Sequence, residues 1–250
     1  MRFYAVLMVL TSLIGWGAAD GVPVGTADAE LNRLCDPSVP LTAPERERLL
    51  SKLRISKEGR KVITDFTKQY GGLQKLLIQW DSVSYSQVVN TAERSPASVD
   101  QKGRLGTAIC VHLSSKLPEI ENLADLAHEI THATRLELAV LKGEVNDVKD
   151  FVHARLAASG GEADAFGVEC QVKKELLGYW DSFCAPYVSE ENRMDTRKVL
   201  SDLYNGNLSA SLTGETYPQL LTRQFKALKN KRTTRQTSGI SALENKRNVQ

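Results

Sequence analysis

The chain has 250 residues, of which 42% are hydrophobic and 25% are charged, and its formal net charge is +2. These values are ordinary for a soluble globular protein, and the length suits one large domain or a small catalytic domain with helical additions. The small net charge argues against nucleic acid as the main partner, so local motifs have to indicate the function.

Residues 1–19 have the features of a signal peptide. Arg2 gives a positive start, residues 5–14 are largely apolar, and residues 17–19 offer small side chains for cleavage. The apolar run is too short to span a bilayer comfortably. We therefore expect a secreted or periplasmic protein that begins near Asp20 and has no transmembrane segment after cleavage. An uncleaved N-terminal anchor is the alternative.

Four cysteines follow the predicted cleavage point: Cys35, Cys110, Cys170 and Cys184. An even number in an exported chain indicates two disulfides, although the sequence alone allows three pairings. We favour the short bridge between Cys170 and Cys184, which leaves Cys35 to pair with Cys110. Free buried thiols are the alternative. No Cys-x-x-Cys pair indicates a zinc ribbon.

Residues 20–103 are expected to form an N-terminal helical region. The segment Thr42–Glu45 has the cap residue, early proline and acidic third position of a helix start. A second helical pattern covers residues 57–70 and stops at Gly71, and a third helix is predicted over residues 73–80. We interpret these helices as scaffold.

Short strands are predicted after the third helix, within residues 83–89 and 106–114, where β-forming residues alternate with small or polar ones. If the second strand lies at a sheet edge beside a cleft, its backbone could pair with an extended peptide substrate. His112 faces the other way from Ile109 in this strand, so we interpret it as a strand residue rather than a ligand.

The central motif of the chain is His-Glu-x-x-His, within residues 122–137. Residues four apart lie on one face of an α-helix, so His128 and His132 can bind a common metal ion. Glu129 lies beside them and can reach a water molecule on that ion, which is the arrangement of a metalloprotease. Asn122 is the predicted helix cap. Two surface histidines without a metal are the alternative.

A helix is predicted over residues 145–158, and the next opens with Gly-Gly-Glu-Ala-Asp-Ala-Phe and runs over residues 162–177. Together with the His-Glu-x-x-His motif, this opening resembles the gluzincin branch of the zincin metallopeptidases, over roughly residues 104–178. The resemblance implies an α+β zincin-like fold, a Zn²⁺ cofactor, and Glu162 as the third metal ligand.

Several positions distinguish this chain from related patterns. A metzincin requires histidine where Leu138 stands, and thermolysin-like gluzincins carry an acidic residue where Phe166 stands. Asp164 is a candidate for orienting a histidine instead, although its helical direction is opposite to that of Glu162. Glu169 is the rival third ligand. It lies about two turns along the same face, so only one of the two glutamates should bind the ion.

Residues 104–230 are expected to form the metallopeptidase core, with further helices over residues 189–204 and 217–229. Residues 231–250 form a basic tail that we expect to be disordered. In peptidases of this kind a Tyr, His or Arg from outside the motif often stabilises the oxyanion. The candidates are His153, Tyr179, Tyr187 and Tyr204.

The sequence therefore predicts an exported zinc metallopeptidase that hydrolyses peptide or protein substrates. His128, His132 and Glu162 would bind Zn²⁺, and Glu129 would accept a proton from the metal-bound water. A non-catalytic zinc-binding protein of the envelope or secreted space is the main alternative, and a helical interaction module without metal is another. Glu129 favours the enzyme, because a structural zinc site has no need of a base between its ligands.

Overall fold

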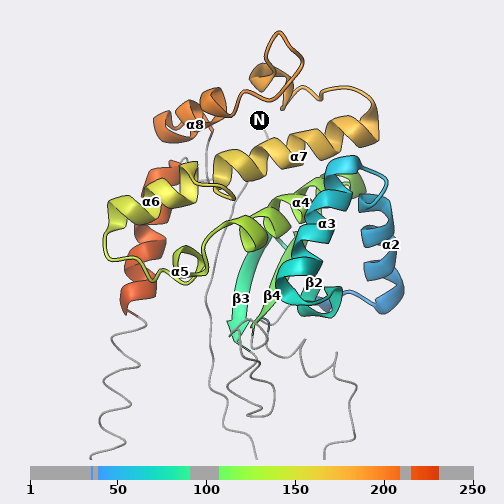
Figure 1. The fold of residues 1–250 in the computed structure, drawn as a ribbon, viewed down its shortest axis with the longest axis horizontal. Coiled ribbons are helices and arrows are strands. Elements are labelled where there is room, and N and C mark those ends of the chain that lie inside the picture. The colour runs from blue at the N-terminus through green and yellow to red at the C-terminus, as the bar shows by residue number, and fades with distance from the viewer. Residues whose placement is uncertain (1–34, 36–38, 91–106, 209–214, 231–250) are drawn as a thin grey trace, which may run out of the picture.

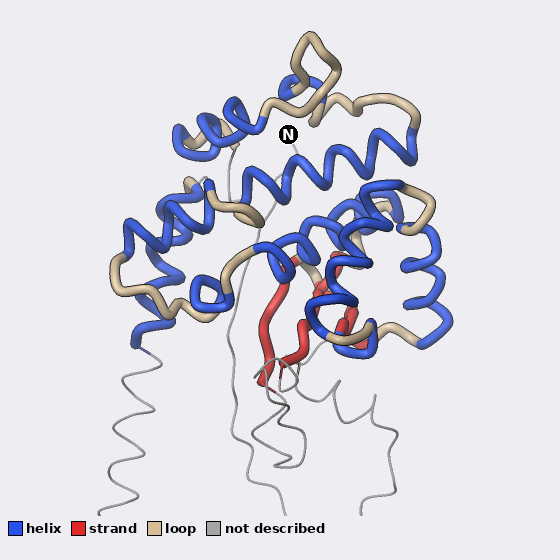
Figure 2. The backbone as a smooth tube through the Cα atoms, in the orientation of Figure 1, coloured by secondary structure: helices blue, strands red, loops and turns tan. Residues whose placement is uncertain are grey.

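The computed structural model of the chain describes residues 35, 39–90, 107–208 and 215–230. Over these residues the fold is mixed α+β, with a small four-stranded sheet and many more helices (Figure 1). Figure 2 shows that the strands form one group and that most helices gather on one side of it. The predicted signal peptide and basic tail lie outside the described residues. No helix in the described part is long and apolar enough to cross a membrane.

The sheet has the strand order β1, β2, β4, β3. β4 pairs in parallel with β2 and antiparallel with β3, so it is an interior strand, and all its residues are buried. The condition for pairing with an extended substrate, that this strand lies at a sheet edge, is therefore not met by β4. Among the described strands, β3 is the edge next to it. The bounds are Val39–Pro40 for β1, Leu76–Asp81 for β2, Tyr85–Asn90 for β3 and Thr107–Ser114 for β4.

The helices cover one face of the sheet and extend beyond it. A last helix occupies residues 217–230. The others are α2 (Ala43–Leu53), α3 (Lys57–Tyr70), α4 (Glu119–Arg135), α5 (Leu138–Leu141), α6 (Val148–Ala157), α7 (Glu162–Leu177) and α8 (Thr196–Asn205).

The first two helices form where the sequence predicts them. The side chain of Thr42 accepts from the backbone of Glu45, whose carboxylate accepts from the backbone of Thr42, which is a complete capping box. Ser56 caps α3, and Gly71 ends it with a left-handed φ of 80°. Both helices bury apolar side chains in the main core against the sheet.

The third predicted helix is wrong. Residues 73–80 form a short 3-10 turn, η1 (Leu73–Lys75), followed by β2. Leu76, Leu77 and Ile78 are all buried, because β2 has a strand on each side and contributes to apolar clusters on both faces. A short apolar run fits a helix or a buried strand equally well, and pairing with β4 decides between them.

The motif helix α4 begins three residues before the predicted cap. Pro118 takes the cap position, and Asn122 donates its side-chain amide to the carbonyl of Leu117 (3.1 Å). Proline is tolerated there because the first N–H groups of a helix have no partner within it. Residues 121–133 are buried all round, since α4 lies between the sheet and α7 (Figure 1).

Other boundaries differ in a similar way. The chain turns after α4, so residues 138–141 form the separate helix α5. α6 and α8 begin at residues 148 and 196, later than predicted, because Asp147 and Asp195 cap them. α7 has the predicted bounds.

Both predicted disulfides are confirmed, and none of the four cysteines is free. Cys35 is joined to Cys110 in β4, and Cys170 in α7 is joined to Cys184 in the loop that follows it. Two disulfides are compatible with an extracellular or periplasmic protein.

A second apolar cluster lies beyond α7. It joins α6, α7 and α8 with the last helix, whose buried members are Tyr217, Leu220, Leu221 and Phe225. This packing holds the start of the last helix beside the start of α7, where the candidate site is found.

Candidate metal centre

The structure brings His128, His132 and Glu162 together in one buried group that could hold a metal ion. The two Nε2 atoms lie 3.0 Å apart, and Oε2 of Glu162 lies 3.4 Å from each of them. His132 and Glu162 are at most 1% exposed, and His128 is 7% exposed. The two histidines, four residues apart in α4, therefore converge with Glu162 at the start of α7, as the sequence predicts.

The outer nitrogen of each histidine is engaged with an acceptor. Nδ1 of His132 lies 2.7 Å from the carbonyl oxygen of Gly160, and Nδ1 of His128 lies 3.1 Å from Oε2 of Glu169. Both partners are acceptors, so both Nδ1 atoms must carry the hydrogen. In the neutral rings, each Nε2 then turns a lone pair toward the other and toward Glu162.

Three acceptor atoms thus face one another without a donor between them. Oε2 of Glu162 is buried and has no hydrogen-bond partner, whereas its other oxygen accepts from Arg155 (3.0 Å). Buried acceptors without a donor are unfavourable, and a cation between the three atoms would satisfy all of them.

The electrostatics of the group also favour positive charge. Burial alone would lower the pKa of His128, but the neighbouring carboxylates of Glu162, Glu169 and Glu129 outweigh it and raise the pKa well above 6.5. Burial would raise the pKa of Glu162, but positive charge on the adjacent imidazoles and on Arg155 holds it well below 4.5. Both shifts favour positive charge between the three side chains.

Glycines place Glu162 against the end of α4. Gly160 has a φ of 77°, and a side chain there would lie 2.5 Å from the backbone nitrogen of Leu136. A residue with a Cβ would push the turn away from α4. The same turn supplies the carbonyl oxygen of Gly160 that orients His132, and it leads directly into Glu162, the first residue of α7.

Glu129 lies beside the metal group but outside it. It is 2% exposed, and its Oε2 accepts a hydrogen bond from the hydroxyl of Ser86 in β3 (2.6 Å). It follows His128 directly in α4, and its charge helps to raise the pKa of that histidine. Glu129 is therefore the carboxylate next to the group that could hold a metal ion, and it is not one of the three residues of that group.

The two other acidic candidates have different roles from those predicted. Glu169 contacts Nδ1 of His128 rather than the inner face of the group, so it is not the third member. Asp164 does not contact a histidine in the structure. It accepts from Arg135 (3.1 Å) and from the backbone of Gly160 (2.8 Å), and so steadies the turn before α7.

The four predicted oxyanion candidates have contacts or exposure that do not involve the metal group. His153 is within 3.2 Å of the hydroxyl of Tyr204, Tyr187 donates to Asp202, and Tyr179 is 61% exposed. His112 is a buried strand residue, as expected. Its ring stacks on Tyr85, and desolvation lowers its pKa to about 4 despite the charge of Asp81.

Sequence reasoning missed Tyr217 and Arg155. Burial raises the pKa of Tyr217 well above 10, and the charges of Glu162, Glu169 and Glu129 act in the same direction. Arg155 is 1% exposed, and its Nε and Nη1 have no hydrogen-bond partner. Neither residue has a local signal, because each reaches the site from a separate helix.

No protein-family model matches the chain, and no curated protein or solved structure matches it either. The functional argument therefore depends on the geometry of this group and on the motifs that form it.

Proposed function

We propose that the protein is an exported zinc metallopeptidase that hydrolyses peptide bonds in peptide or protein substrates. One observation carries the proposal: the inner atoms of His128, His132 and Glu162 converge within 3.4 Å of one another, with the carboxylate of Glu129 beside them. Three ligands and an adjacent base are the parts of a hydrolytic site, whereas a structural zinc site is closed by four ligands.

The donor set and its spacing favour zinc. Imidazole nitrogen and carboxylate oxygen are both common zinc ligands, and ligands in a tetrahedral zinc site lie about 3.3 Å from each other. The three distances here are 3.0, 3.4 and 3.4 Å. Both histidines donate their outer N–H to an acceptor, which is the usual support for a metal-bound imidazole.

Bound zinc would lower the pKa of a water molecule and polarise the scissile carbonyl. Glu129 would accept the proton of that water and pass it to the leaving amine. Ser86 donates to one oxygen of Glu129, which leaves the other oxygen to work as the base. Arg155 holds Glu162 through a fully buried ion pair and so keeps the third ligand in place.

Negative charge develops on the carbonyl oxygen during hydrolysis, and a preorganised donor can stabilise it. Tyr217 and Arg155 are the proposed donors. Tyr217 is buried and feels the charges of Glu162, Glu169 and Glu129, and Arg155 has two donor nitrogens without a partner beside Glu162. We favour these two residues over the four tyrosine and histidine candidates predicted from the sequence.

The edge strand β3 is the proposed docking site for substrate. Its Ser86 contacts Glu129, so the strand runs past the predicted base, and among the described strands only β4 pairs with it. An extended peptide that adds to this edge would pass the metal ion.

The test is a comparison of wild-type protein with Glu129→Gln on a peptide library or denatured protein. Chelation should abolish wild-type hydrolysis and added zinc should restore it. Glu129→Gln should bind zinc normally but hydrolyse roughly a hundredfold to ten-thousandfold more slowly, as expected for loss of a general base. Hydrolysis by Glu129→Gln at the wild-type rate would refute the mechanism. Zinc binding without hydrolysis in the wild type would favour a non-catalytic zinc protein.

A further inference from the structure

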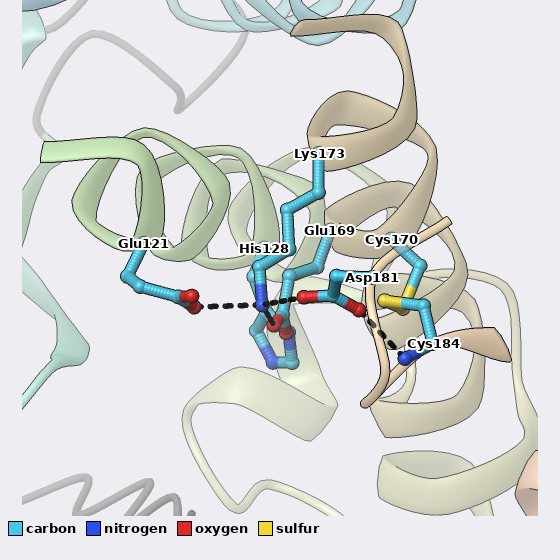
Figure 3. The surroundings of a disulfide bond; sticks show 7 residues. All are labelled: Glu121, His128, Glu169, Cys170, Lys173, Asp181 and Cys184. Atoms are coloured by element: carbon cyan, nitrogen blue, oxygen red, sulfur yellow. Dashed lines mark hydrogen bonds and ion pairs between the residues drawn. A yellow bond between two sulfur atoms is a disulfide. The ribbon is translucent and has the colours of Figure 1, made fainter. Parts of the chain in front are cut away.

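A buried cluster of charges lies next to the metal group, on the outer side of His128 (Figure 3). At its centre is Lys173 of α7, which is 1% exposed. Its Nζ lies 2.8 Å from Glu121, 2.9 Å from Glu169 and 3.7 Å from Asp181. A fully buried ammonium group is rare, because its desolvation has to be offset by several close partners.

The three carboxylates come from three different parts of the chain. Glu121 belongs to the first turn of α4, Glu169 to the middle of α7, and Asp181 to the loop after α7. Lys173 therefore ties the two helices of the metal group and the following loop together at one atom. We call Lys173 and these three carboxylates the lysine cage.

Glu169 connects the lysine cage to the metal group. Its Oε1 lies 2.9 Å from Lys173, and its Oε2 accepts from Nδ1 of His128 at 3.1 Å. The two oxygens of one carboxylate are therefore fixed by an ammonium on one side and an imidazole on the other. Because a carboxylate held at one oxygen cannot swing freely, the position of Lys173 determines the position of the acceptor for His128.

The disulfide closes the cage from the far side. Cys170 follows Glu169 directly in α7 and is bonded to Cys184, whose backbone N–H donates to Asp181 (2.8 Å). Figure 3 shows this loop turning back toward Lys173 beside the disulfide. The covalent bond therefore keeps the third carboxylate of the cage next to α7.

We propose that Lys173 is a positioning residue for the metal centre. It fixes Glu169, which holds the hydrogen on Nδ1 of His128 and sets the plane of the ring, so that Nε2 faces the ion. The disulfide loop completes this arrangement through Asp181. The inference rests on the proposed metal site, and it assigns to Lys173 a role that the sequence spacing does not indicate.

A simple charge argument gives the opposite expectation for a variant. Replacing Lys173 with an uncharged residue adds net negative charge near the ion, and charge alone would make zinc bind more tightly. If Lys173 acts by positioning, the loss of order in Glu169 and His128 makes zinc bind more weakly. The direction of the change therefore separates the two accounts.

The experiment measures zinc affinity of the oxidised full-length protein by competition with a chromophoric chelator. Lys173→Met keeps the length and apolar stem of the side chain and removes its charge. We expect its zinc affinity to fall about tenfold to a hundredfold, which is typical for loss of support to a metal-bound histidine. In the zinc-loaded wild type, the Nδ1 proton of His128 should give a slowly exchanging NMR signal, and this signal should be lost in the variant.

Lys52→Met is the matched control. Lys52 lies in α2 and forms an ion pair with Glu119, which belongs to α4 as Glu121 does. Lys52 is partly exposed, and Glu119 lies outside the lysine cage. Its removal should leave zinc affinity and the His128 signal unchanged. If Lys173→Met does not fold, Glu121→Gln and Asp181→Asn each remove one cage carboxylate. Loss of negative charge alone would weaken zinc binding in these two variants, so the His128 signal decides: it should be lost if the cage positions the ring and retained if only charge matters.

The proposal is overturned if the folded cage variants bind zinc as tightly as the wild type or more tightly. It is also overturned if the His128 signal is unaffected in them. A wild-type protein that binds no zinc refutes the metal site itself, which is a different outcome from equal binding by wild type and variants.

Discussion

The two sides of α4 are equally buried but are built from different kinds of side chain. The side toward the sheet and α3 carries Leu123, Leu126 and Ile130, which pack in the main apolar core. The other side is polar: Glu121, His128 and His132 contact residues of α7. On the same polar side, Asp125 and Glu129 accept hydrogen bonds from Ser84, just before β3, and Ser86, in β3. Apolar packing stabilises the fold whatever is bound, whereas buried ionisable groups stabilise it only when each has a partner.

The difference indicates which side has been shaped by function. On the polar side, burial and the charge of Glu169 raise the pKa of Asp125 to about 7, and Ser84 donates to its carboxylate. Replacing such a polar network with apolar residues is often neutral or stabilising, so stability alone does not account for it. The cation site that we propose would account for it.

Loss of a disulfide should have the largest effect on stability. The two disulfides should differ in whether their loss also affects the metal group. Cys35 and Cys110 are 75 residues apart, and Cys170 and Cys184 are 14 apart. The chain-entropy model gives losses of about 4.5 and about 3 kcal/mol in the free energy of unfolding. Paired Cys→Ala variants can be compared by denaturant unfolding.

The disulfide whose loss costs less stability should be the one whose loss weakens zinc binding. Only the Cys170→Ala/Cys184→Ala variant should bind zinc more weakly, because only that disulfide holds Asp181 in the lysine cage. A weaker zinc site after loss of the Cys35–Cys110 bond, with the other variant normal, would contradict the assignment of the two sides.

A cavity on the apolar side should reduce stability without touching the metal centre. Phe66 in α3 is fully buried and stacks on Tyr70, with ring centroids 4.5 Å apart. Phe66→Ala should lower the free energy of unfolding of the metal-free protein by about 3–5 kcal/mol. The folded variant should keep wild-type zinc affinity in the chelator assay, and a tenfold loss would mean that the two sides are coupled.

The smallest predicted effect concerns pH and a histidine that is not part of the site. Desolvation lowers the pKa of His112 to about 4 in the folded protein, from 6.5. The unfolded chain therefore binds a proton between these values while the folded protein does not, so stability is lost as pH falls from 6.5 to 4. The loss from this residue should be about 3 kcal/mol, because each tenfold difference in proton affinity corresponds to about 1.4 kcal/mol.

His112→Gln provides the comparison for this prediction. Its free energy of unfolding should fall less steeply than that of the wild type across the same pH range, whatever its value at pH 7. Equal slopes in urea titrations at pH 7, 5.5 and 4.5 would show that His112 does not titrate in this way.

The sequence predicts best where local signals decide the structure. The cap at Thr42, the stop at Gly71 and the opening of α7 after Gly161 are all found where they are expected. The position of Glu162 follows from the same local rules, since a turn rich in glycine brings the start of α7 close to α4.

The sequence predictions fail where contacts with residues distant in sequence determine the secondary structure or the burial of a side chain. β2 is a strand because β4 pairs with it, and Tyr217 is buried through the packing of the last helix. Glu169 and Lys173 are four residues apart, a spacing typical of an exposed ion pair on a helix. The structure buries the pair instead, because α4 brings Glu121 over it.

The most direct test of the account is the zinc content of the wild-type protein and of two glutamate variants at saturating zinc. The account predicts one zinc per chain in the wild type, little or none in Glu162→Ala, and close to one in Glu169→Ala, which should only bind it more weakly. No zinc in the wild type would contradict the metal site. Loss of zinc in Glu169→Ala with normal binding in Glu162→Ala would transfer the third ligand to Glu169 and contradict the geometry described.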